Sequence, residues 1–474
     1  MSDTLWTFAD FLAATGGTLE GATGADVTGI SIDSRTLSAG NAFFAIVGDR
    51  LDGHAYVKGA LDRGAAVAVV ERDRVKDAVT GPLIVVDDTL KALENVGRAA
   101  RARTSAGIVA VTGSVGKTGT KEALRLTLSR SGAVHASQKS FNNHWGVPLS
   151  LSQMPQETAY GIFEIGMNHP GEITPLVDMV RPHVAIITTV APVHIEYFES
   201  EEAIARAKAE IFFGVVPGGT AVLNRDNRHF DLLASLAREA GIERIASFGE
   251  AEDADVRLLK LAAKAECSCV SASVFGQELT YKVGAPGRHL VDNSLAVLAA
   301  VHLLGANLAL AGLALAEFAP PSGRGARHTL WLRDGKATLI DESYNANPVS
   351  MRAAISLLAS SEPTRPGRRV AVLGDMLELG DDSQDLHADL AGPLMEAKVD
   401  RVYCAGPEMR ALWEALPNGR RGAYGEKSSE IESALRSELM PGDVVMIKGS
   451  AGSKMTPVAE ALQKRFARPT EKNV

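Results

Sequence analysis

The chain has 474 residues, of which 46% are hydrophobic and 22% are charged. This length predicts about three domains, and the composition is typical of a globular protein rather than a disordered or membrane-spanning one. The formal net charge of −8 argues against a nucleic-acid partner or an anionic membrane partner, so any phosphate must be bound by local basic groups.

The cysteines and the apolar stretches indicate the compartment. Cys267, Cys269 and Cys404 are few and odd in number, which favours a reducing compartment over a disulfide framework. The pair at 267 and 269 has no second pair nearby, so we expect strand-face side chains rather than zinc ligands. Residues 1–10 contain acidic side chains and no apolar core, and the apolar stretch 295–318 is interrupted by polar residues. We therefore expect a cytoplasmic protein without a signal peptide or membrane insertion.

The first segment, residues 1–105, has the pattern of a small α/β domain. Short apolar runs rich in β-branched residues alternate with brief helical stretches. The predicted strands are 27–32, 41–47, 65–70 and 83–86.

The second segment, residues 106–320, alternates strands and helices regularly. The alternation predicts a mainly parallel sheet with helices on both faces, and ligands of such sheets bind beyond the carboxyl ends of the strands. The predicted strands are 108–111, 160–165, 184–190, 221–223 and 244–248. The predicted helices are 118–131, 171–180, 200–213 and 229–240.

The strongest local signal is the run Thr112–Thr118, a glycine-bearing loop between a predicted strand and a predicted helix. Such a loop and the positive end of its helix cradle phosphate, with Lys117 on the outer phosphates and the Thr118 hydroxyl on magnesium. Val111 stands where the standard phosphate loop has glycine, which favours ATP-dependent ligases over GTPases and motor proteins. The alternative is a turn with a surface lysine. The expected ATP-binding residues here are Gly113, Ser114, Val115, Gly116, Lys117, Thr118 and Gly119.

Three ionisable residues near these strand ends are candidate metal ligands. Glu164 ends a strand beside the loop, where a carboxylate can fix nucleotide-bound magnesium; a glutamate in a surface turn is the alternative. His194 follows the next strand, and either a metal or phosphate role or a structural hydrogen bond is open. Lys208 falls on the apolar stripe of its helix. Its stem can simply cover the core, or its amine can be desolvated, neutral and able to add carbon dioxide as a metal-binding carbamate.

The third segment, residues 321–474, follows a turn-rich linker and predicts a second open α/β sheet, of the dinucleotide-binding type. Its predicted strands are 337–340, 369–373, 402–404 and 444–447. Three polar stretches follow these strands, and their concurrence predicts a second half-site, although each alone is compatible with an ordinary turn. The stretches are 341–348, 374–380 and 448–450.

In combination these motifs resemble the Mur ligases, the ATP-dependent enzymes that build the peptide of the bacterial cell-wall precursor. The resemblance spans nearly the whole chain and rests on Thr112–Thr118, Glu164, Ala191–His194, Ala205–Phe212, Gly287–Asn293 and Tyr344–Pro348. Further motifs are similar to those of members that add D-alanyl-D-alanine to UDP-N-acetylmuramoyl-tripeptide. These are Asp33–Arg35, Ser140–Asn143, Asn168–Glu172, Ser343–Asn347 and Leu373–Gly380.

The resemblance implies three domains: a UDP-sugar-binding domain (1–105), a P-loop ATPase domain (106–320) and a Rossmann-like domain (321–474) that closes on ATP and binds D-alanyl-D-alanine. It implies two Mg²⁺ ions served by Thr118, Glu164, His194 and a carbamylated Lys208, with catalysis by Lys117, Glu164, His194, Lys208 and Arg324. Further implied ATP contacts are Asn293, Arg324, Asn345, Asn347 and Asp375. Implied substrate contacts are Ser34, Arg35, Asn142, Asn143, Asn168 and Lys448.

The chain departs from the family pattern at two places. His144-Trp145 stand where members often carry an acidic and a small apolar residue, and Ala451 stands where many have arginine. The open alternatives are another Mur-type ligase with a different amino acid and, less favoured, a non-catalytic nucleotide-binding regulator. We expect a monomer, and the sequence leaves open diaminopimelate or lysine as the third peptide residue.

Overall fold

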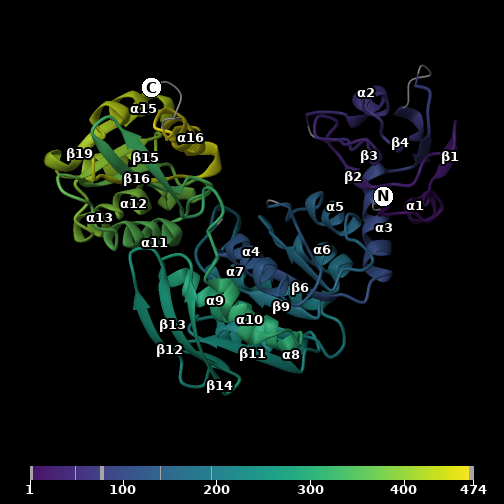
Figure 1. The fold of residues 1–474 in the computed structure, drawn as a ribbon, viewed down its shortest axis with the longest axis horizontal. Helices are drawn as coiled ribbons and strands as arrows, with labels where there is room; N and C mark the ends of the chain where they lie inside the picture. The colour runs from purple at the N-terminus through teal and green to yellow at the C-terminus, as the bar shows by residue number, and fades with distance from the viewer. Residues whose placement is uncertain (1–3, 49, 75–78, 139, 194, 469–474) are drawn as a thin grey trace, which may run out of the picture.

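The computed structural model describes residues 4–48, 50–74, 79–138, 140–193 and 195–468. It contains three sheets that follow one another along the chain, each with its own helices. The first and third lie at opposite ends of the molecule with the central one between them (Figure 1). The predicted three-part α/β architecture is confirmed, whereas the predicted site residue His194 lies outside the described residues.

The first sheet has the strand order β1-β5-β4-β3-β2, with β1 antiparallel and the other strands parallel. α1 and α3 pack on one face and α2 on the other. The short, largely exposed β1 carries little apolar signal, and it was not predicted. The elements are α1 (Phe8–Thr15), β1 (Thr18–Glu20), β2 (Gly29–Ser31), β3 (Asn41–Phe44), α2 (Val57–Asp62), β4 (Val67–Glu71), β5 (Leu83–Val86) and α3 (Thr89–Ala102).

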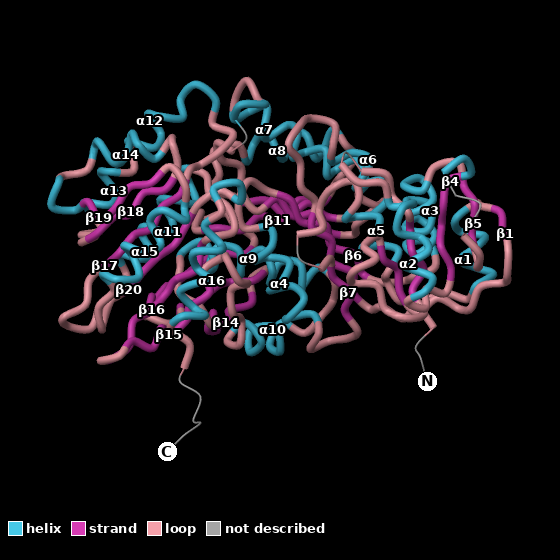
Figure 2. The backbone as a smooth tube through the Cα atoms, turned by 90° about the horizontal axis from the view of Figure 1, so that it is seen from above, coloured by secondary structure: helices cyan, strands magenta, loops and turns pink. Residues whose placement is uncertain are grey.

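The central sheet has the order β14-β13-β12-β11-β10-β9-β6-β8-β7. Strands β6 to β12 all run parallel to one another. An antiparallel ribbon of β13 and β14 extends the sheet beyond β12. α4, α9 and α10 cover one face and α5 to α8 the other, so that helices flank the strands on both sides (Figure 2). The strands are β6 (Gly107–Thr112), β7 (Val134–Ala136), β8 (Tyr160–Glu164), β9 (Val184–Ile187), β10 (Thr220–Asn224), β11 (Arg244–Gly249), β12 (Val256–Ala263), β13 (Ser268–Val274) and β14 (Gln277–Val283).

The helices of this domain are α4 (Lys117–Leu128), α5 (Gly146–Ser152), α6 (Ile173–Val180), α7 (Glu201–Ala209), α8 (Phe230–Glu239), α9 (Arg288–Leu303) and α10 (Leu308–Leu315). The predicted helix 200–213 is shorter, because it tightens into a 3₁₀ turn at Glu210–Gly214. The apolar stretch 295–318 contains the second half of α9 and the whole of α10. Among the described residues, no helix is both long and apolar enough to cross a membrane. Cys269 lies on β13 as expected, but Cys267 precedes the strand by one residue.

The third sheet has the order β15-β16-β20-β17-β18-β19, with β15 antiparallel and the remaining strands parallel. α11 to α14 pack on one face and α15 and α16 on the other. The edge strands β15 and β19 were not predicted. The elements are β15 (Ala326–Leu332), β16 (Gly335–Glu342), α11 (Pro348–Ala359), β17 (Arg369–Gly374), α12 (Ser383–Ala388), α13 (Ala391–Glu396), β18 (Arg401–Ala405), α14 (Met409–Ala415), β19 (Arg421–Gly425), α15 (Ser428–Glu438), β20 (Val444–Lys448) and α16 (Met455–Arg465).

Candidate active site

The loop from β6 to α4 needs its two glycines. Gly113 and Gly116 have φ of 147° and 90°, which residues with a Cβ rarely adopt. A Cβ built on Gly116 lies 2.6 Å from Asn293 Nδ2, and one on Gly113 collides with the hydroxyl of Thr188. α4 then begins at Lys117 with no side-chain cap, because its N-cap residue is Gly116. The first N–H groups of α4 therefore have no side-chain acceptor, which is the arrangement that binds phosphate at a helix N-terminus.

The segment that follows β9 holds this loop in place. Ser114 Oγ donates to the carbonyl of Ala191 (2.9 Å) and accepts from its N–H (3.0 Å), while the Ser114 N–H donates to Thr189 O (2.9 Å). Thr188 Oγ1 donates to the carbonyl of Val115 (2.6 Å). The sequence reasoning missed this support. The adjacent threonines at the end of the predicted strand were the only signal for it.

Glu164 accepts two side-chain hydrogen bonds on its carboxylate at this sheet edge. It ends β8 in register with Val111, one residue before the end of β6, and it is 1% exposed. Thr118 Oγ1 donates to Glu164 Oε2 (2.8 Å), and Asn142 Nδ2 donates to Oε1 (2.8 Å). The surface-turn alternative is thus wrong. A buried carboxylate beside a threonine hydroxyl and a phosphate-binding loop supplies the oxygen ligands that Mg²⁺ prefers.

Two cationic side chains, Lys117 and Arg324, lie near this carboxylate, and the buried amine of Lys208 lies near Lys117. Lys117 Nζ donates to the carbonyl of Gly113 (2.7 Å), and burial lowers the pKa of Lys117, with Glu164 opposing this effect and Arg324 adding to it. Lys208 is 2% exposed, and burial, reinforced by the positive charge of Lys117, holds its pKa well below the ordinary value, which disfavours its charged form. Lys117 and Arg324 therefore form a positive field that suits a polyphosphate.

Arg324 reaches this edge from the linker. Its Nη2 donates to Ser140 Oγ (3.2 Å), and its Cζ lies 4.0 Å from the centroid of the Tyr344 ring. The buried Asp341 accepts from the N–H of Gly323 (3.0 Å) and so fixes the linker next to Arg324. Asp341 and Tyr344 lie in a motif that the sequence singled out, but neither was predicted as a site residue.

In the third domain, the residues predicted to contact ATP form hydrogen bonds with other groups of the protein. Asn347 Oδ1 accepts from the N–H of Ser350 (2.8 Å) as the N-cap of α11. Asp375 Oδ1 accepts from the N–H of Met409 (2.9 Å) at the start of α14. The carbonyl of Asn345 accepts from the buried Lys448 Nζ (2.9 Å), which also lies 3.4 Å from Glu342. Their contact with a nucleotide stays a prediction.

The predicted substrate contacts lie in four places, one of which is the buried Lys448 at the end of β20. Ser34 and Arg35 line a first-domain pocket of about 530 Å³, where the Arg35 side chain is 85% exposed and pairs with Asp33 (2.7 Å). Asn142 contacts Glu164, as described, and Asn143 Oδ1 accepts from the N–H of Gly146 (2.9 Å) at the start of α5. Asn168 lies in an exposed turn, where its N–H donates to Glu172 (2.8 Å).

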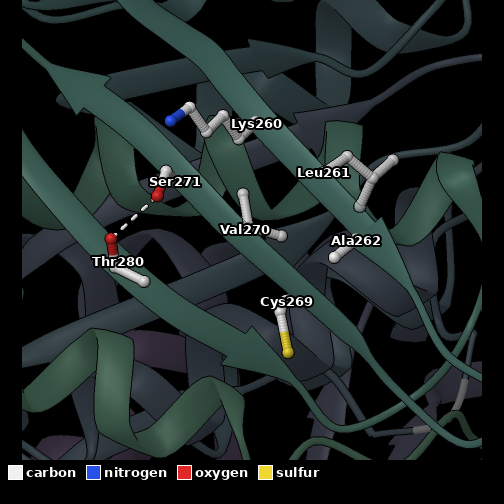
Figure 3. Close-up of a pocket in the computed structure, with 7 residues that line it drawn as sticks. All are labelled: Lys260, Leu261, Ala262, Cys269, Val270, Ser271 and Thr280. Carbon is white, nitrogen blue, oxygen red and sulfur yellow. Dashed lines mark hydrogen bonds between the residues drawn. The ribbon is translucent and has the colours of Figure 1, made fainter.

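A second hollow lies on the outer ribbon of the central sheet, on the face drawn in Figure 3. Lys260 is the one charged side chain that lines it, and a hydrogen bond joins Ser271 to Thr280 (2.8 Å). No polar groups converge there, so it is not a candidate site. Within the described ranges, no group of three or more histidine, cysteine and carboxylate side chains is arranged to hold a metal.

Comparisons with known proteins match most of the chain. The Mur ligase family catalytic domain matches residues 26–101, the Mur ligase middle domain 111–301, and the Mur ligase glutamate ligase domain 327–451. The UDP-N-acetylmuramoyl-tripeptide--D-alanyl-D-alanine ligase of Rickettsia prowazekii is 31% identical, covering 92% of this chain and 95% of the relative.

Two solved structures are similar over nearly their whole length. MurF from Acinetobacter baumannii has a TM-score of 0.84 at 29% identity, covering 97% of this chain and 99% of that one. MurF ligase from Thermotoga maritima in complex with ADP has a TM-score of 0.76 at 26% identity, covering 92% and 97%. The chain belongs to the Mur ligase family.

Proposed function

We propose that this chain joins D-alanyl-D-alanine to UDP-N-acetylmuramoyl-tripeptide, with conversion of ATP to ADP and phosphate, as the last cytoplasmic step toward the UDP-linked pentapeptide. The proposal rests on one observation. Arg324, from the linker, donates a hydrogen bond to the same loop that also contacts the buried pair of Glu164 and Thr118. The full-length similarity to D-alanyl-D-alanine ligases supports the choice of substrates.

The reaction has two transfers. An oxygen of the tripeptide's terminal carboxylate attacks the γ-phosphorus of ATP, the bond from that phosphorus to the β,γ-bridging oxygen breaks, and ADP leaves with the electron pair. The amine of D-alanyl-D-alanine then attacks the carbonyl carbon of the acyl phosphate. The tetrahedral intermediate collapses to the amide as phosphate leaves, and the former amine loses a proton.

The protein's contribution is to neutralise charge and to position the reacting groups. Lys117, Arg324 and the uncapped N-terminus of α4 surround the transferring phosphoryl group with positive charge, which is most of the catalytic effect in such steps. Because Arg324 and the loop carrying Lys117 belong to different domains, the complete site requires the third domain to close on the central one.

Thr118 and Glu164 fit one Mg²⁺ ion, and a carbamylated Lys208 fits a second. Burial disfavours the charged form of Lys208 and so favours the neutral amine that can add carbon dioxide: an N–C bond forms, a proton leaves, and a carboxylate-like group results. His194, also expected to serve these ions, is outside the described part of the chain. Bound Mg²⁺ supplies further neutralisation of the phosphates and of the acceptor carboxylate.

The carbamate has a chemical test. Lys208→Ala should lose nearly all activity and recover part of it with added short carboxylic acids, whereas Lys208→Ala in buffer of equal ionic strength should not recover. Failure of rescue by every acid, in a variant whose thermal unfolding matches the wild type, would count against the carbamate.

The reaction itself is tested by phosphate release from ATP. We expect release only when UDP-N-acetylmuramoyl-tripeptide and D-alanyl-D-alanine are both present, with single D-amino acids and L-glutamate as the comparison amines. Release with a different amine keeps the ligase and overturns the choice of substrate. If no amine gives phosphate release, the result favours a non-catalytic nucleotide-binding protein. Since one chain supplies the whole proposed site, we also expect the monomer to be active, and sedimentation under assay conditions tests this.

A further inference from the structure

The loop between β7 and α5 contacts three parts of the molecule within six residues. Ser140 Oγ accepts from Arg324 of the linker (3.2 Å), and Asn142 Nδ2 donates to Glu164 (2.8 Å). Trp145, at the other end of the loop, lines the first-domain pocket. The same short segment therefore connects the phosphoryl-transfer site with the pocket that contains Ser34 and Arg35.

Trp145 is the central domain's contribution to this pocket. The other lining residues all belong to the first domain, among them Ser34, Arg35, Gly48, Arg50 and Tyr56. A Cβ built on Gly48 lies 3.0 Å from Cη2 of Trp145, so the end of the indole rests against the backbone there. Trp145 also packs against the core cluster of the first domain. It forms a wall of the pocket that the first domain cannot supply by itself.

The ring is held in place by its surroundings. Asn143 Oδ1 accepts from the N–H of Trp145 (3.3 Å) and from the N–H of Gly146 (2.9 Å), which fixes the turn into α5. The His144 ring meets the indole edge to face, with centroids 5.2 Å apart and an interplanar angle of 67°. α5 in turn packs on α3, which follows the first sheet. A fixed aromatic side chain costs little conformational entropy when it binds a ligand.

The pocket combines two kinds of recognition. Arg35 and Arg50 are exposed cations at its rim, which suits the phosphates of a nucleotide sugar. Trp145 and the 44% exposed Tyr56 offer flat aromatic surfaces, on which a planar base or a sugar face can pack.

We infer that Trp145 is a specificity-determining residue that packs against the nucleotide-sugar half of bound UDP-N-acetylmuramoyl-tripeptide, and that its loop links this contact through Asn142 to Glu164. The inference rests on the proposed function. Because Trp145 and Asn142 are three residues apart, a ligand on the indole restrains the residue that orients the Glu164 carboxylate. By thermodynamic reciprocity, a ligand in the pocket and a nucleotide at the loop then change each other's affinity by the same factor.

Calorimetric titration with UDP alone tests the contact. Trp145→Ala should weaken UDP binding about tenfold, as expected for loss of one aromatic surface under a base, and Trp145→Phe should stay within about threefold. Gly48→Ala, which pushes against Cη2, should weaken it as well. Trp413→Phe, in α14 of the third domain, is the matched control and should bind UDP unchanged. In wild type, saturating UDP should alter the Kd of the nonhydrolysable ATP analogue, and in Trp145→Ala this change should vanish.

Steady-state kinetics distinguishes a failure of the Trp145 contact from a failure of the proposed function. The KM for UDP-N-acetylmuramoyl-tripeptide should rise with Trp145→Ala in the same proportion as the Kd of UDP, while the KM for D-alanyl-D-alanine stays unchanged. Unchanged UDP binding in Trp145→Ala and Gly48→Ala would overturn the role of Trp145 and leave the ligase intact. A wild-type protein that neither binds UDP nor turns over the UDP-linked tripeptide would overturn the proposed function itself. If Trp145→Ala unfolds, Gly48→Ala decides.

Discussion

The central and third domains both place polar residues beyond the carboxyl ends of parallel strands, but the partners of these residues differ. In the central domain, Glu164 binds the side chains of Thr118 and Asn142, which come from two other elements. In the third domain, Asn347 and Asp375 accept hydrogen bonds from backbone N–H groups of their own domain. A polar residue at a strand end therefore indicates the edge where ligands bind, but not whether it faces the ligand or the protein.

The helix starts show the same contrast. α4 begins at a glycine and leaves its first N–H groups without a side-chain acceptor, whereas α11 has a complete capping box formed by Asn347 and Ser350. Asp375 similarly satisfies the N–H of Met409 at α14. Of these three helices, α4 thus leaves donors for a phosphate, whereas the first N–H groups of α11 and α14 find acceptors in their own domain, which stabilises the fold instead. Substitutions in the central domain should accordingly lower activity, whereas those in the third domain should lower the free energy of unfolding.

The largest expected effect is on catalysis in the central domain. Lys117→Met should lower kcat/KM at least about 10³-fold, because a positive charge aimed at the transferring phosphoryl group is lost. Thermal unfolding should change little, since burial already disfavours the charged form of this lysine. Initial rates of phosphate release and a melting curve test both statements. An active Lys117→Met would place the phosphate elsewhere and remove the basis of the comparison.

Arg324→Ala should lower kcat about 10²- to 10³-fold, because the linker then brings no charge to the site. The Tyr344 ring is a separate contribution: Tyr344→Phe keeps the aromatic face under Arg324 and should retain activity, while Tyr344→Ala should cost a few-fold at most. Single-turnover rates measure this series. Equal losses in Tyr344→Phe and Arg324→Ala would show that the phenol hydroxyl is required as well as the guanidinium, and would contradict the expected order.

The sequence predicted the parallel strands and the phosphate loop well, because β-branched runs and a glycine-bearing turn are local signals. It missed the edge strands β1, β7, β15 and β19, and it did not predict β12 or the ribbon of β13 and β14 as part of the central sheet. It identified Glu164 as a strand-end residue but could not show that Thr118 and Asn142 reach it. Contacts between segments distant in sequence, such as Ser140 with Arg324, depend on how the domains pack and have no local pattern.

Asp375 gives a stability test in the third domain. Asp375→Ala should lower the free energy of unfolding by about 1–3 kcal/mol, because the N–H of Met409 loses its acceptor in a buried place. Asp375→Asn keeps an acceptor and should cost less. Neither variant should change the KM for ATP if the carboxylate faces the protein alone. A large rise in that KM would instead support the nucleotide contact that the family resemblance implies.

The pH dependence of the stability that Asp375 contributes follows from the direction in which its pKa is shifted. Burial raises the pKa of Asp375, with the Met409 hydrogen bond opposing, so the folded protein holds this proton more tightly than the unfolded chain. The resulting stabilisation is fully present below the unfolded pKa and is lost as pH rises through the folded pKa. The free energy of unfolding of wild type minus that of Asp375→Asn should therefore fall between pH 3 and neutral pH. Urea unfolding at several pH values measures this difference, and a rising difference would contradict it.

The smallest expected effect is at Asn347. Asn347→Ala removes the acceptor of the Ser350 N–H and should cost about 1 kcal/mol of unfolding free energy, the usual value for an N-cap. Asn347→Asp keeps the cap and should restore stability. If the side chain serves only α11, the KM for ATP will be unchanged in both. A KM for ATP that rises about tenfold in the stable Asn347→Asp variant would instead mean that the amide also contacts the nucleotide. The third domain would then contribute a side chain both to its own helix and to the ligand, and the contrast with the central domain would hold only for Asp375.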